Sequence, residues 1–488
     1  MKNKIPQEVL GIAETLHKAG HEAYLVGGCV RDLILNKEPK DWDVATNAMP
    51  DEILKLFPES FYENEFGTVG VKTDSLDDRL KVVEVTTFRV EGKYSDKRRP
   101  DEVRFVKTIE DDLSRRDFTI NALALNLADG IAKNIIDPFE GQNDLKKKII
   151  RAVRDPDERF SEDALRLMRA VRLGTELGFE IEKETAAALR RNAAALGSIA
   201  RERIRDEVAK ILLAEEAASG IERLEEAGLL LYIFPELREG IGVGQNKHHI
   251  YTVWEHNIRA LEYSAKKGYS LEVRLASLLH DVGKPRTKRG EGPDSTFHGH
   301  EVVGAKMARK MLEALCFSKE ITDWVTDLVR FHLFYYNVGE VTEAGVRRFL
   351  RRVGPDLVPD LIKVREADRI GSGVPKAVPY KIRHLLFMIE KVKQDPISPK
   401  MLKMNGNDMM ALLKIEPGPR VGFILSILLE EVLDDPSRNT KDYLESRAQE
   451  LHHREDGELN MLAKTAREKK EEFENVEEEE IKKKFYVK

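Results

Sequence analysis

The sequence predicts an α+β fold in which a head with a mixed sheet is followed by a long all-α remainder. In the first 150 residues, short runs rich in β-branched residues alternate with helical patterns. From about residue 155 onward, alanine, leucine and charged helix formers dominate the chain. Its length of 488 residues is sufficient for several domains, each with its own core.

The head is expected to contain short strands and short helices. The apolar residues within the first 20 positions recur at helical spacing, and "MPDEILKLF" over 49–57 also has the pattern of a helix. Three runs have the pattern of strands: "AYLVGG" over 23–28, "VGVKT" over 69–73 and "KVVEVTTF" over 81–88.

The remainder is divided by two breaks. Helices are expected over 161–178, 184–196, 200–213 and 436–451, and the breaks are "FPELREGIGVGQNKHH" over 234–249 and "GSGVPKAVPYK" over 371–381. The resulting prediction has five segments: a head (1–150), a helical neck (151–235), a histidine-rich domain (236–375), a helical tail (376–455) and a charged end (456–488).

Composition excludes few functions. The net charge of −6 neither requires nor excludes nucleic acid, because a basic groove can exist within a nearly neutral total. Two cysteines, Cys29 and Cys316, argue against a disulfide framework or a cysteine zinc site and favour a reducing compartment. The sequence has no signal-peptide core and no run long enough to cross a bilayer. A cytoplasmic protein with no membrane partner is predicted.

The segment "LVGGCVRDLILNKEPKDWDVAT" combines two features of phosphate chemistry. Asp41 and Asp43 would present two carboxylates on one face if the chain is extended there, and such a pair needs a cation between its charges. Hard oxygen ligands of this kind suit Mg²⁺. Gly27 and Gly28 allow the backbone to approach a phosphate before a helix, where Arg31 would contact that phosphate. These parts predict metal-assisted phosphoryl or nucleotidyl transfer.

That segment resembles the signature of the class II tRNA nucleotidyltransferases, or CCA-adding enzymes, and of the related bacterial poly(A) polymerases. The resemblance continues in order through "VEVTTFRVEGKYSDKRRPDEVRF" (83–105), "RRDFTINALALN" (115–126), "EDALRLMRAVR" (162–172) and "RERIRDEVAKIL" (201–212). It also extends to a tail region around 405–440. It implies a polymerase β-like nucleotidyltransferase head with ATP and CTP as substrates and tRNA as the partner.

The resemblance also implies roles for individual residues. Asp41 and Asp43 would hold the catalytic Mg²⁺, and Glu84 is either a third catalytic carboxylate or an exposed strand residue. The residues expected to bind the nucleotide are Gly28, Arg31, Arg115, Arg116, Asp117, Asn121, Asp163, Arg166, Arg169 and Arg172. For Arg169 and Arg172, a solvated helix charge is the alternative.

Asp163 and Arg166 suggest how a nucleotide is chosen without a template. At i and i+3 they are expected to share one helix face. Aspartate accepts and arginine donates hydrogen bonds, which matches the donor–acceptor order on cytosine and adenine and not that on guanine and uracil. The alternative is an ordinary surface ion pair.

Two related activities remain open. Poly(A) polymerases usually carry a basic "GRRF"-like stretch, where this chain has "NEFGTVGVKT" over 64–73, which favours CCA addition. The loop "EGKYSDKRRPDEVRF" is complete, which favours addition of the terminal A. Its presence does not separate a full CCA enzyme from one that adds only A.

A second constellation lies in the histidine-rich segment. "HHIYTVWEH", "LLHDVGKP", "FHGHE", "RFHLF" and "READRIG" occur in the order typical of an HD phosphohydrolase domain. The resemblance implies a metal set of His256, His280, Asp281 and Asp368, which His300 and His332 extend to a second metal. Imidazole with carboxylate suits a divalent transition metal or Mg²⁺.

Two rival functions come from other classes. The chain could be an HD phosphohydrolase that acts on RNA 3′ phosphates, with a head that only binds RNA, or a non-catalytic RNA-binding module. The intact carboxylates and the "EDALR" motif disfavour both. The sequence leaves the oligomeric state open.

Overall fold

The computed structural model describes residues 5–64, 67–92, 103–127, 135–246, 250–334, 336–373, 378, 380–393, 402–468 and 486. Residues 93–102 of the predicted loop, His248 and His249, and most of the charged end beyond 468 lie outside the described residues. None of the helices described is long and apolar enough to cross a membrane.

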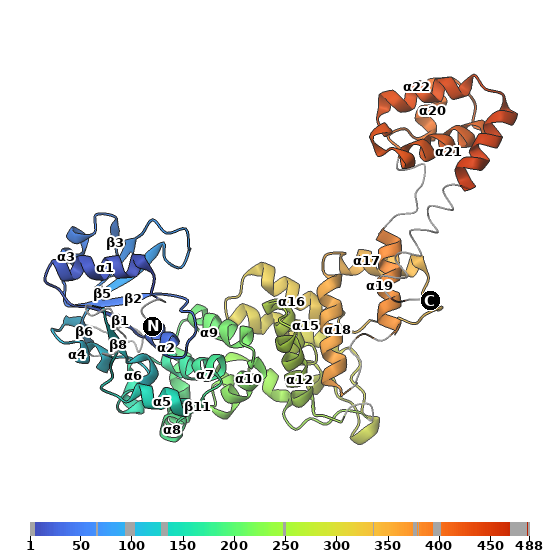
Figure 1. The fold of residues 1–488 in the computed structure, drawn as a ribbon. Helices are drawn as coiled ribbons and strands as arrows, with labels where there is room; N and C mark the ends of the chain where they lie inside the picture. Colours follow the sequence, from blue (N-terminus) through green and yellow to red (C-terminus); the bar gives the residue numbers. More distant parts are fainter. Residues whose placement is uncertain are drawn as a thin grey trace. The chain divides into compact units, whose positions relative to one another are not determined.

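Contacts divide the chain into two compact units. Figure 1 colours its elements in chain order, from the head in blue to α22 in red. The first unit comprises Met1–His332 with Lys363–Pro375, and the second unit comprises Leu333–Ile362 with Lys376–Lys488. The first unit therefore contains the predicted head and neck and every residue of the histidine constellation. The finer division into five segments stays a prediction.

The head is built on a seven-stranded sheet with the order β3-β4-β5-β2-β1-β8-β9. Its strands are β1 (Ala23–Val26), β2 (Asp43–Thr46), β3 (Ser60–Asn64), β4 (Thr68–Lys72), β5 (Val82–Thr87), β8 (Ala124–Asn126) and β9 (Ile135–Ile136). β2 and β5 pair in parallel, while the other neighbours pair antiparallel, so the predicted mixed sheet is confirmed.

Small elements surround this sheet. They are α1 (Gln7–Lys18), α2 (Gly28–Ile34), α3 (Pro50–Leu56), α4 (Ile109–Ser114), α5 (Gly141–Lys147) and the hairpin of β6 (Arg89–Glu91) with β7 (Val103–Phe105). The predicted first helix is α1, whose buried residues Val9, Ile12, Ala13 and Leu16 follow the helical period. In α4, Ile109 and Leu113 pack with Tyr24, Ala45 and Phe88 in one core. This core covers part of one sheet face.

The neck is helical, as predicted, but its first helix is interrupted. Its elements are α6 (Pro156–Glu162), α7 (Leu165–Leu177), α8 (Lys183–Asn192), α9 (Arg201–Leu213), α10 (Ala217–Glu226), α11 (Leu230–Ile233) and the short parallel pair β10 (Ile149–Ile150) and β11 (Glu180–Ile181). The helix expected over 161–178 is broken at Asp163, which has an extended backbone with φ −129° and ψ 104°. The Asp163 carboxylate accepts the backbone N–H of Leu165 at 3.0 Å. This local bond competes with a continuous helix.

The histidine-rich segment is also helical. Its helices are α12 (Val253–Lys266), α13 (Leu271–Leu279), α14 (Lys284–Thr287), α15 (His300–Ala314), α16 (Lys319–Phe331) and α18 (Val358–Gly371). Thr252 and Glu255 form a capping box that begins α12, and Ser270 caps α13. These caps fix where the helices that carry His256 and His280 begin.

The second unit holds α17 (Glu343–Val353), α19 (Tyr380–Lys393), α20 (Gly406–Leu413), α21 (Pro419–Asp434) and α22 (Lys441–His452). Buried apolar residues between positions 402 and 463 pack into one cluster, which includes Met409, Ile424, Leu428 and Leu444. The expected tail helix over 436–451 is found as α22.

Candidate functional sites

Two carboxylate residues are register partners on neighbouring strands of the head sheet. Asp43 begins β2, and its register partner on β5 is Glu84. Register partners on neighbouring strands direct their side chains to the same face, and such strands lie about 4.8 Å apart. The sheet thus places Glu84 beside Asp43. The register beside Asp43 fits a third carboxylate, and the exposed side chain fits an exposed strand residue, so the role of Glu84 stays a prediction.

The predicted alternation of a strand does not place Asp41 beside Asp43. The strand begins at Asp43, so Asp41 lies before it and the alternation of a strand does not place its side chain. Both aspartates are nevertheless close enough to the buried thiol of Cys29 to affect its pKa. Burial, together with the charges of Asp43 and Asp41, raises the pKa of the Cys29 thiol to about 12. Both carboxylates therefore lie near the start of α2.

The loop before α2 is shaped by a glycine. Gly27 has φ +77°, and a Cβ there would lie 2.7 Å from Nη1 of Arg116 and 3.8 Å from Oδ2 of Asp43. A side chain at this position would thus displace the guanidinium of Arg116 or strain the backbone. The arrangement brings a glycine turn, an arginine and a carboxylate together beside the start of α2.

A chain of polar contacts joins this loop to the neck. Arg31 donates to Oδ1 of Asn121 at 2.8 Å, and the amide of Asn121 donates to Oδ1 of Asp117 at 3.2 Å. Oδ2 of Asp117 accepts two bonds from Arg169 on α7, at 2.7 and 2.6 Å. Burial alone would raise the pKa of Asp117, but the charge of Arg169 holds it well below its ordinary value. Four predicted nucleotide-binding residues are thus brought into one connected group.

Arg115 and Arg116 share a buried partner that the sequence analysis did not include. Asp112 on α4 is 1% exposed and accepts from Arg115 at 2.9 Å and from Arg116 at 3.4 Å. Burial opposes its ionisation, yet the two arginines lower its pKa below the ordinary value. Asp112 therefore holds both arginines, and Arg116 is the one that lies at Gly27 beside Asp43.

The expectation that Asp163 and Arg166 share a helix face is wrong. Asp163 lies in the break between α6 and α7, and Arg166 lies in α7. Arg166 is 7% exposed and donates to Glu162 at 2.6 Å and to the backbone carbonyl of Arg115 at 3.0 Å. The Asp163 carboxylate lies 3.4 Å from Arg203 on α9.

Two of these partners, Glu162 and Arg203, were missed. Glu162 adjoins Asp163 within the quoted motif, and Arg203 lies in the last neck motif, so each was visible without an assigned role. Arg172 is also engaged within the neck, with Glu207 at 2.6 Å and Glu176 at 2.9 Å. For Arg172, contact with a nucleotide stays a prediction.

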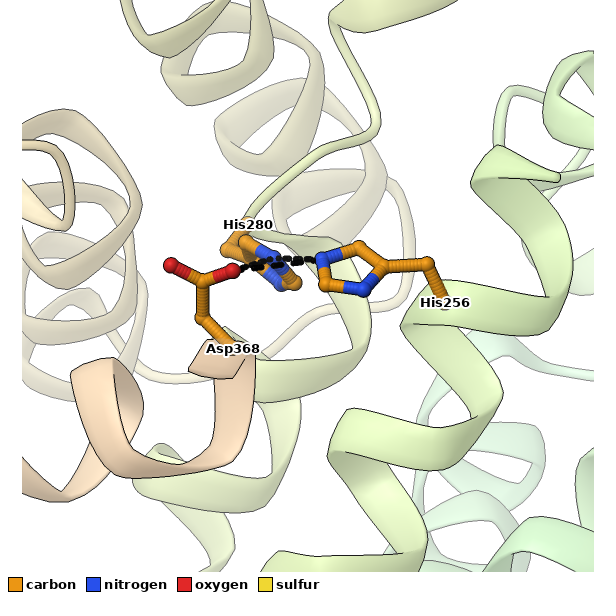
Figure 2. A group of neighbouring side chains, drawn as sticks. All are labelled: His256, His280 and Asp368. Carbon is orange, nitrogen blue, oxygen red and sulfur yellow. Dashed lines mark hydrogen bonds and ion pairs between the residues drawn. The ribbon is translucent and has the colours of Figure 1, made fainter. Parts of the chain in front are cut away.

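The six predicted ligands of the histidine constellation form two adjacent groups. His256, His280 and Asp368 form one, and Asp281, His300 and His332 form the other; the ligand atoms within each group lie within 4.8 Å of one another. Figure 2 shows the first group, in which the rings of His256 and His280 and the carboxylate of Asp368 point toward one another. They come from α12, the end of α13 and α18.

Asp281 lies between the two groups. Its Oδ2 is 3.1 Å from Nε2 of His256, and its Oδ1 is 3.2 Å from Nε2 of His300. One carboxylate thus faces both groups, the arrangement expected of a ligand that bridges two cations. The sequence analysis placed Asp281 in the first metal set, whereas the geometry places it between the sets.

The histidine tautomers fit a metal site. Nδ1 of His280, His300 and His332 each lies 2.7–2.8 Å from the carbonyl oxygen three residues earlier. A proton on Nδ1 makes this bond and leaves the lone pair of Nε2 directed into the cluster. Burial would lower the pKa of His280, but the charge of Asp281 raises it to about 10. The adjacent carboxylates therefore favour positive charge beside His280, which a bound divalent cation would also supply.

Lys284 is a further member of this pocket that was missed. Its Nζ lies 2.6 Å from Oδ2 of Asp281 and donates to Gln245 at 2.6 Å, and its side chain is almost fully buried. The motif "HDVGKP" contained it, three residues after Asp281. Its spacing alone did not distinguish it from a surface lysine.

Family models match three parts of the chain. The poly A polymerase head domain matches residues 23–151, a probable RNA- and SrmB-binding site of polymerase A matches 178–241, and the HD domain matches 253–372. An A-adding tRNA nucleotidyltransferase of Deinococcus radiodurans is 36% identical over 84% of this chain and 91% of its own length. The chain belongs to the family of CCA-adding enzymes and related tRNA nucleotidyltransferases.

Other relatives in this family differ in name and in coverage. A CCA-adding enzyme of Geobacillus sp. (strain WCH70) is 47% identical, over 48% of this chain and 55% of its own length. A CC-adding tRNA nucleotidyltransferase of Thermus thermophilus is 36% identical over 84% of this chain and 89% of its own length. The match thus covers about half of the length of the Geobacillus enzyme and most of the length of the Deinococcus and Thermus enzymes.

The fold matches this tRNA nucleotidyltransferase family as well. The crystal structure of the Bacillus stearothermophilus CCA-adding enzyme in complex with CTP superposes with a TM-score of 0.59 and 29% identity. The match covers 91% of this chain and 96% of that one. The predicted family, fold class and HD domain are confirmed.

Proposed function

We propose that this chain adds CCA, or its terminal A, to the 3′ end of tRNA, using CTP and ATP and releasing pyrophosphate. The observation that carries this proposal is the row formed by Asp43 and Glu84, with Asp41 just before it and Gly27 and Arg116 beside it. Relatives named for CCA, A and CC addition support the reaction class and leave the number of added nucleotides to experiment.

Mg²⁺ suits this set of donors, because carboxylates offer hard oxygen ligands and Asp43 and Glu84 are register partners on neighbouring strands. Asp41 and Asp43 would hold the cation, with Glu84 as the third carboxylate. A cation held there would supply a lower pKa for the attacking 3′-hydroxyl and balance for the charge of the departing pyrophosphate.

The remaining roles belong to the chain itself. Arg116 and the loop at Gly27 and Gly28 receive the triphosphate, and Asp112 keeps Arg116 oriented toward it. The linked residues Arg31, Asn121 and Asp117 hold that loop against the neck. Asp163 lies in the break before α7 and Arg166 in the first turn of α7. We assign both to the Watson–Crick edge of cytosine or adenine, for which Arg166 would exchange its contact with Glu162 and Asp163 its contact with Arg203.

Incorporation of labelled CTP and ATP tests this proposal. Three tRNA substrates would be used, ending at the discriminator base, after one C and after two Cs. Stepwise addition of C, C and A identifies a complete CCA enzyme, and addition of A only after two Cs identifies an A-adding enzyme. Long A tails would identify a poly(A) polymerase and reject the proposal.

The matched variants are Asp43→Asn and Asp51→Asn. Asp51 is an exposed aspartate on α3 of the same head. Removing Asp43 should lower the incorporation rate by about 100- to 1000-fold, as expected when a group that stabilises transition-state charge is lost. Asp51→Asn should leave the rate unchanged, and equal rates in the two variants would contradict the assignment of Asp43.

A second activity is favoured by the two histidine–aspartate groups, which fit two divalent cations bridged by Asp281. We propose metal-dependent hydrolysis of phosphate at RNA 3′ ends. The assay would follow phosphate release from RNA that ends in a 3′-phosphate or a 2′,3′-cyclic phosphate, with Mn²⁺ or Mg²⁺ added. Asp281→Asn should abolish release, whereas His298→Ala, at an exposed histidine of the same segment, should not. Release that survives in Asp281→Asn would reject this second function.

We also propose a cytoplasmic location. Both cysteines are free, Cys29 within the core and Cys316 at the surface, which suits a reducing compartment. Localisation of a tagged chain in intact cells would test it.

A further inference from the structure

An aromatic residue lies in the same line of register partners across the sheet as the carboxylates that we propose for catalysis. Along this line Phe61 on β3 pairs with Gly70 on β4, Gly70 pairs with Glu84 on β5, and Glu84 pairs with Asp43 on β2. Because register partners share a face, Phe61 lies on the face that carries the carboxylates. Glu84 is two strand spacings away, about 10 Å.

The ring of Phe61 is both supported and exposed. It lies directly over Gly70, where a Cβ would meet its Cζ at 2.6 Å, yet the residue is 40% exposed. Lys72 has the same orientation as Gly70, two residues on, and its ammonium is 5.9 Å from the ring centroid. Val82, the register partner of Lys72, is also 40% exposed. These four side chains, Phe61, Lys72, Val82 and Glu84, form an open patch with an aromatic surface and a cation.

The order of the strands decides which substrate meets this patch. Gly27 directly follows β1, and Arg116 lies beside it in space. In the sheet, β1 lies next to β2 on the side away from β5. The triphosphate is therefore expected on the β1 side of Asp43. In-line transfer requires the attacking and leaving oxygens to be on opposite sides of the phosphorus. The attacking 3′-hydroxyl must then approach from the side of Glu84 and Phe61.

We propose that Phe61 is the stacking platform for the base at the single-stranded 3′ end of the tRNA, with Lys72 beside its backbone phosphate. This inference rests on the proposed tRNA nucleotidyl transfer and assigns a place to the RNA substrate. Stacking on an aromatic ring tolerates any base, because every base has a π-face. Such a contact suits an enzyme whose substrate ends in a different base at each step.

The competing explanation is structural. An aromatic ring across from a strand glycine shields the backbone of that glycine, and this role alone accounts for the position of Phe61. A leucine or methionine would also cover Gly70 but would offer no flat face to a base. The two explanations therefore predict different results for these substitutions.

The first test compares the steady-state kinetics of Phe61→Leu and Phe61→Trp on a tRNA that ends in two Cs. Loss of one base stack should raise the KM for tRNA in Phe61→Leu by about 5- to 150-fold, while the KM for ATP stays within about twofold. Phe61→Trp should stay near the wild type. Should Phe61→Leu unfold, Phe61→Met replaces it, because its unbranched side chain covers the glycine without a ring.

The matched control is Tyr62→Leu. Tyr62 is the next residue of β3, is 46% exposed and pairs with Val69, so its side chain points to the opposite face of the sheet. This substitution should leave the KM for tRNA unchanged. An equal KM for tRNA in Phe61→Leu and Tyr62→Leu would overturn the proposal.

A fluorescent primer provides a readout that does not depend on turnover. A tRNA with 2-aminopurine as its terminal base should be quenched on binding to the wild type and to Phe61→Trp, and much less on binding to Phe61→Leu. Equal quenching in all three would also overturn the stacking role. Absence of nucleotide incorporation by the wild type would instead reject the proposed function, so the two failures are distinguishable.

Discussion

At the scale of single residues, Asp117 shows how one buried carboxylate holds several site residues. It is 8% exposed and accepts from Arg169, from the amide of Asn121 and from the backbone N–H of Phe118 at 2.8 Å. Asp117→Asn keeps the shape but leaves the charge of Arg169 unpaired. We expect the free energy of unfolding to fall by about 1–3 kcal/mol, the range for hydrogen bonds to charged groups. The KM for ATP should rise, because Asn121 and Arg31 lose their anchor.

The control for this prediction is an exposed pair of the same type. Asp157 is 45% exposed and pairs with Arg191 at 2.6 Å. Exposed ion pairs contribute little, so Asp157→Asn should leave urea unfolding and the KM for ATP nearly unchanged. Equal unfolding free energies for the two variants would show that Asp117 is not an anchor.

The same pair predicts a dependence on pH. Despite its burial, Asp117 has a pKa below its ordinary value because Arg169 stabilises the carboxylate. The contribution of the pair is therefore present above the unfolded pKa of about 3.9 and is lost as the pH falls below it. The difference in unfolding free energy between the wild type and Asp117→Asn should be constant from about pH 5 to 8 and shrink below about pH 4. Urea titrations across this range measure it, and a difference that grows in acid would refute the assignment.

At the scale of secondary-structure elements, α18 brings Asp368 to the histidine groups and is itself held by two tyrosines. Tyr269 and Tyr263 donate to Glu366 on α18, at 2.8 and 3.3 Å. Replacing both tyrosines with phenylalanine should loosen α18 and weaken Mn²⁺ binding at this site by about 10- to 100-fold, as for other residues that orient metal ligands. Nucleotide addition by the head should not change.

Calorimetric titration with Mn²⁺ measures this effect, in the Asp43→Asn background so that the head carboxylates contribute less. Tyr232→Phe, on α11 and outside the helices that carry the ligands, is the control. An unchanged dissociation constant in the double tyrosine variant would mean that α18 is fixed by other contacts.

At the scale of the whole molecule, the second unit contains a core drawn from residues 402–463. Deleting residues 402–488 removes that core together with its surface lysines and arginines. We expect weaker tRNA binding and a shallower dependence of log K on log salt, by about one unit of slope for each phosphate that these cations neutralise. The KM for ATP should stay the same. Titrations at several KCl concentrations test this, and an identical slope would show that the tail binds no phosphate of the tRNA.

The sequence by itself determined the class of the fold and the family, and it named most of the residues that we propose for the two sites. Short β-branched runs became β1, β4 and β5 because their pattern is local, and the helices of the neck followed from composition in the same way. The chemical types of the histidine ligands were also local, so all six could be named and were found together.

Only the tertiary structure decided how these residues are paired. The parallel register of β2 with β5, which places Glu84 beside Asp43, joins segments 41 positions apart, and no local pattern encodes such a register. The break at Asp163 depends on a side-chain bond to Leu165 that a helical period cannot reveal. Asp112 and Lys284 were overlooked because charged residues are usually solvated, and only burial against specific partners distinguishes them. The type of each residue can be read directly from the sequence. Pairing and burial, in contrast, depend on which distant segments of the chain come into contact in the folded structure.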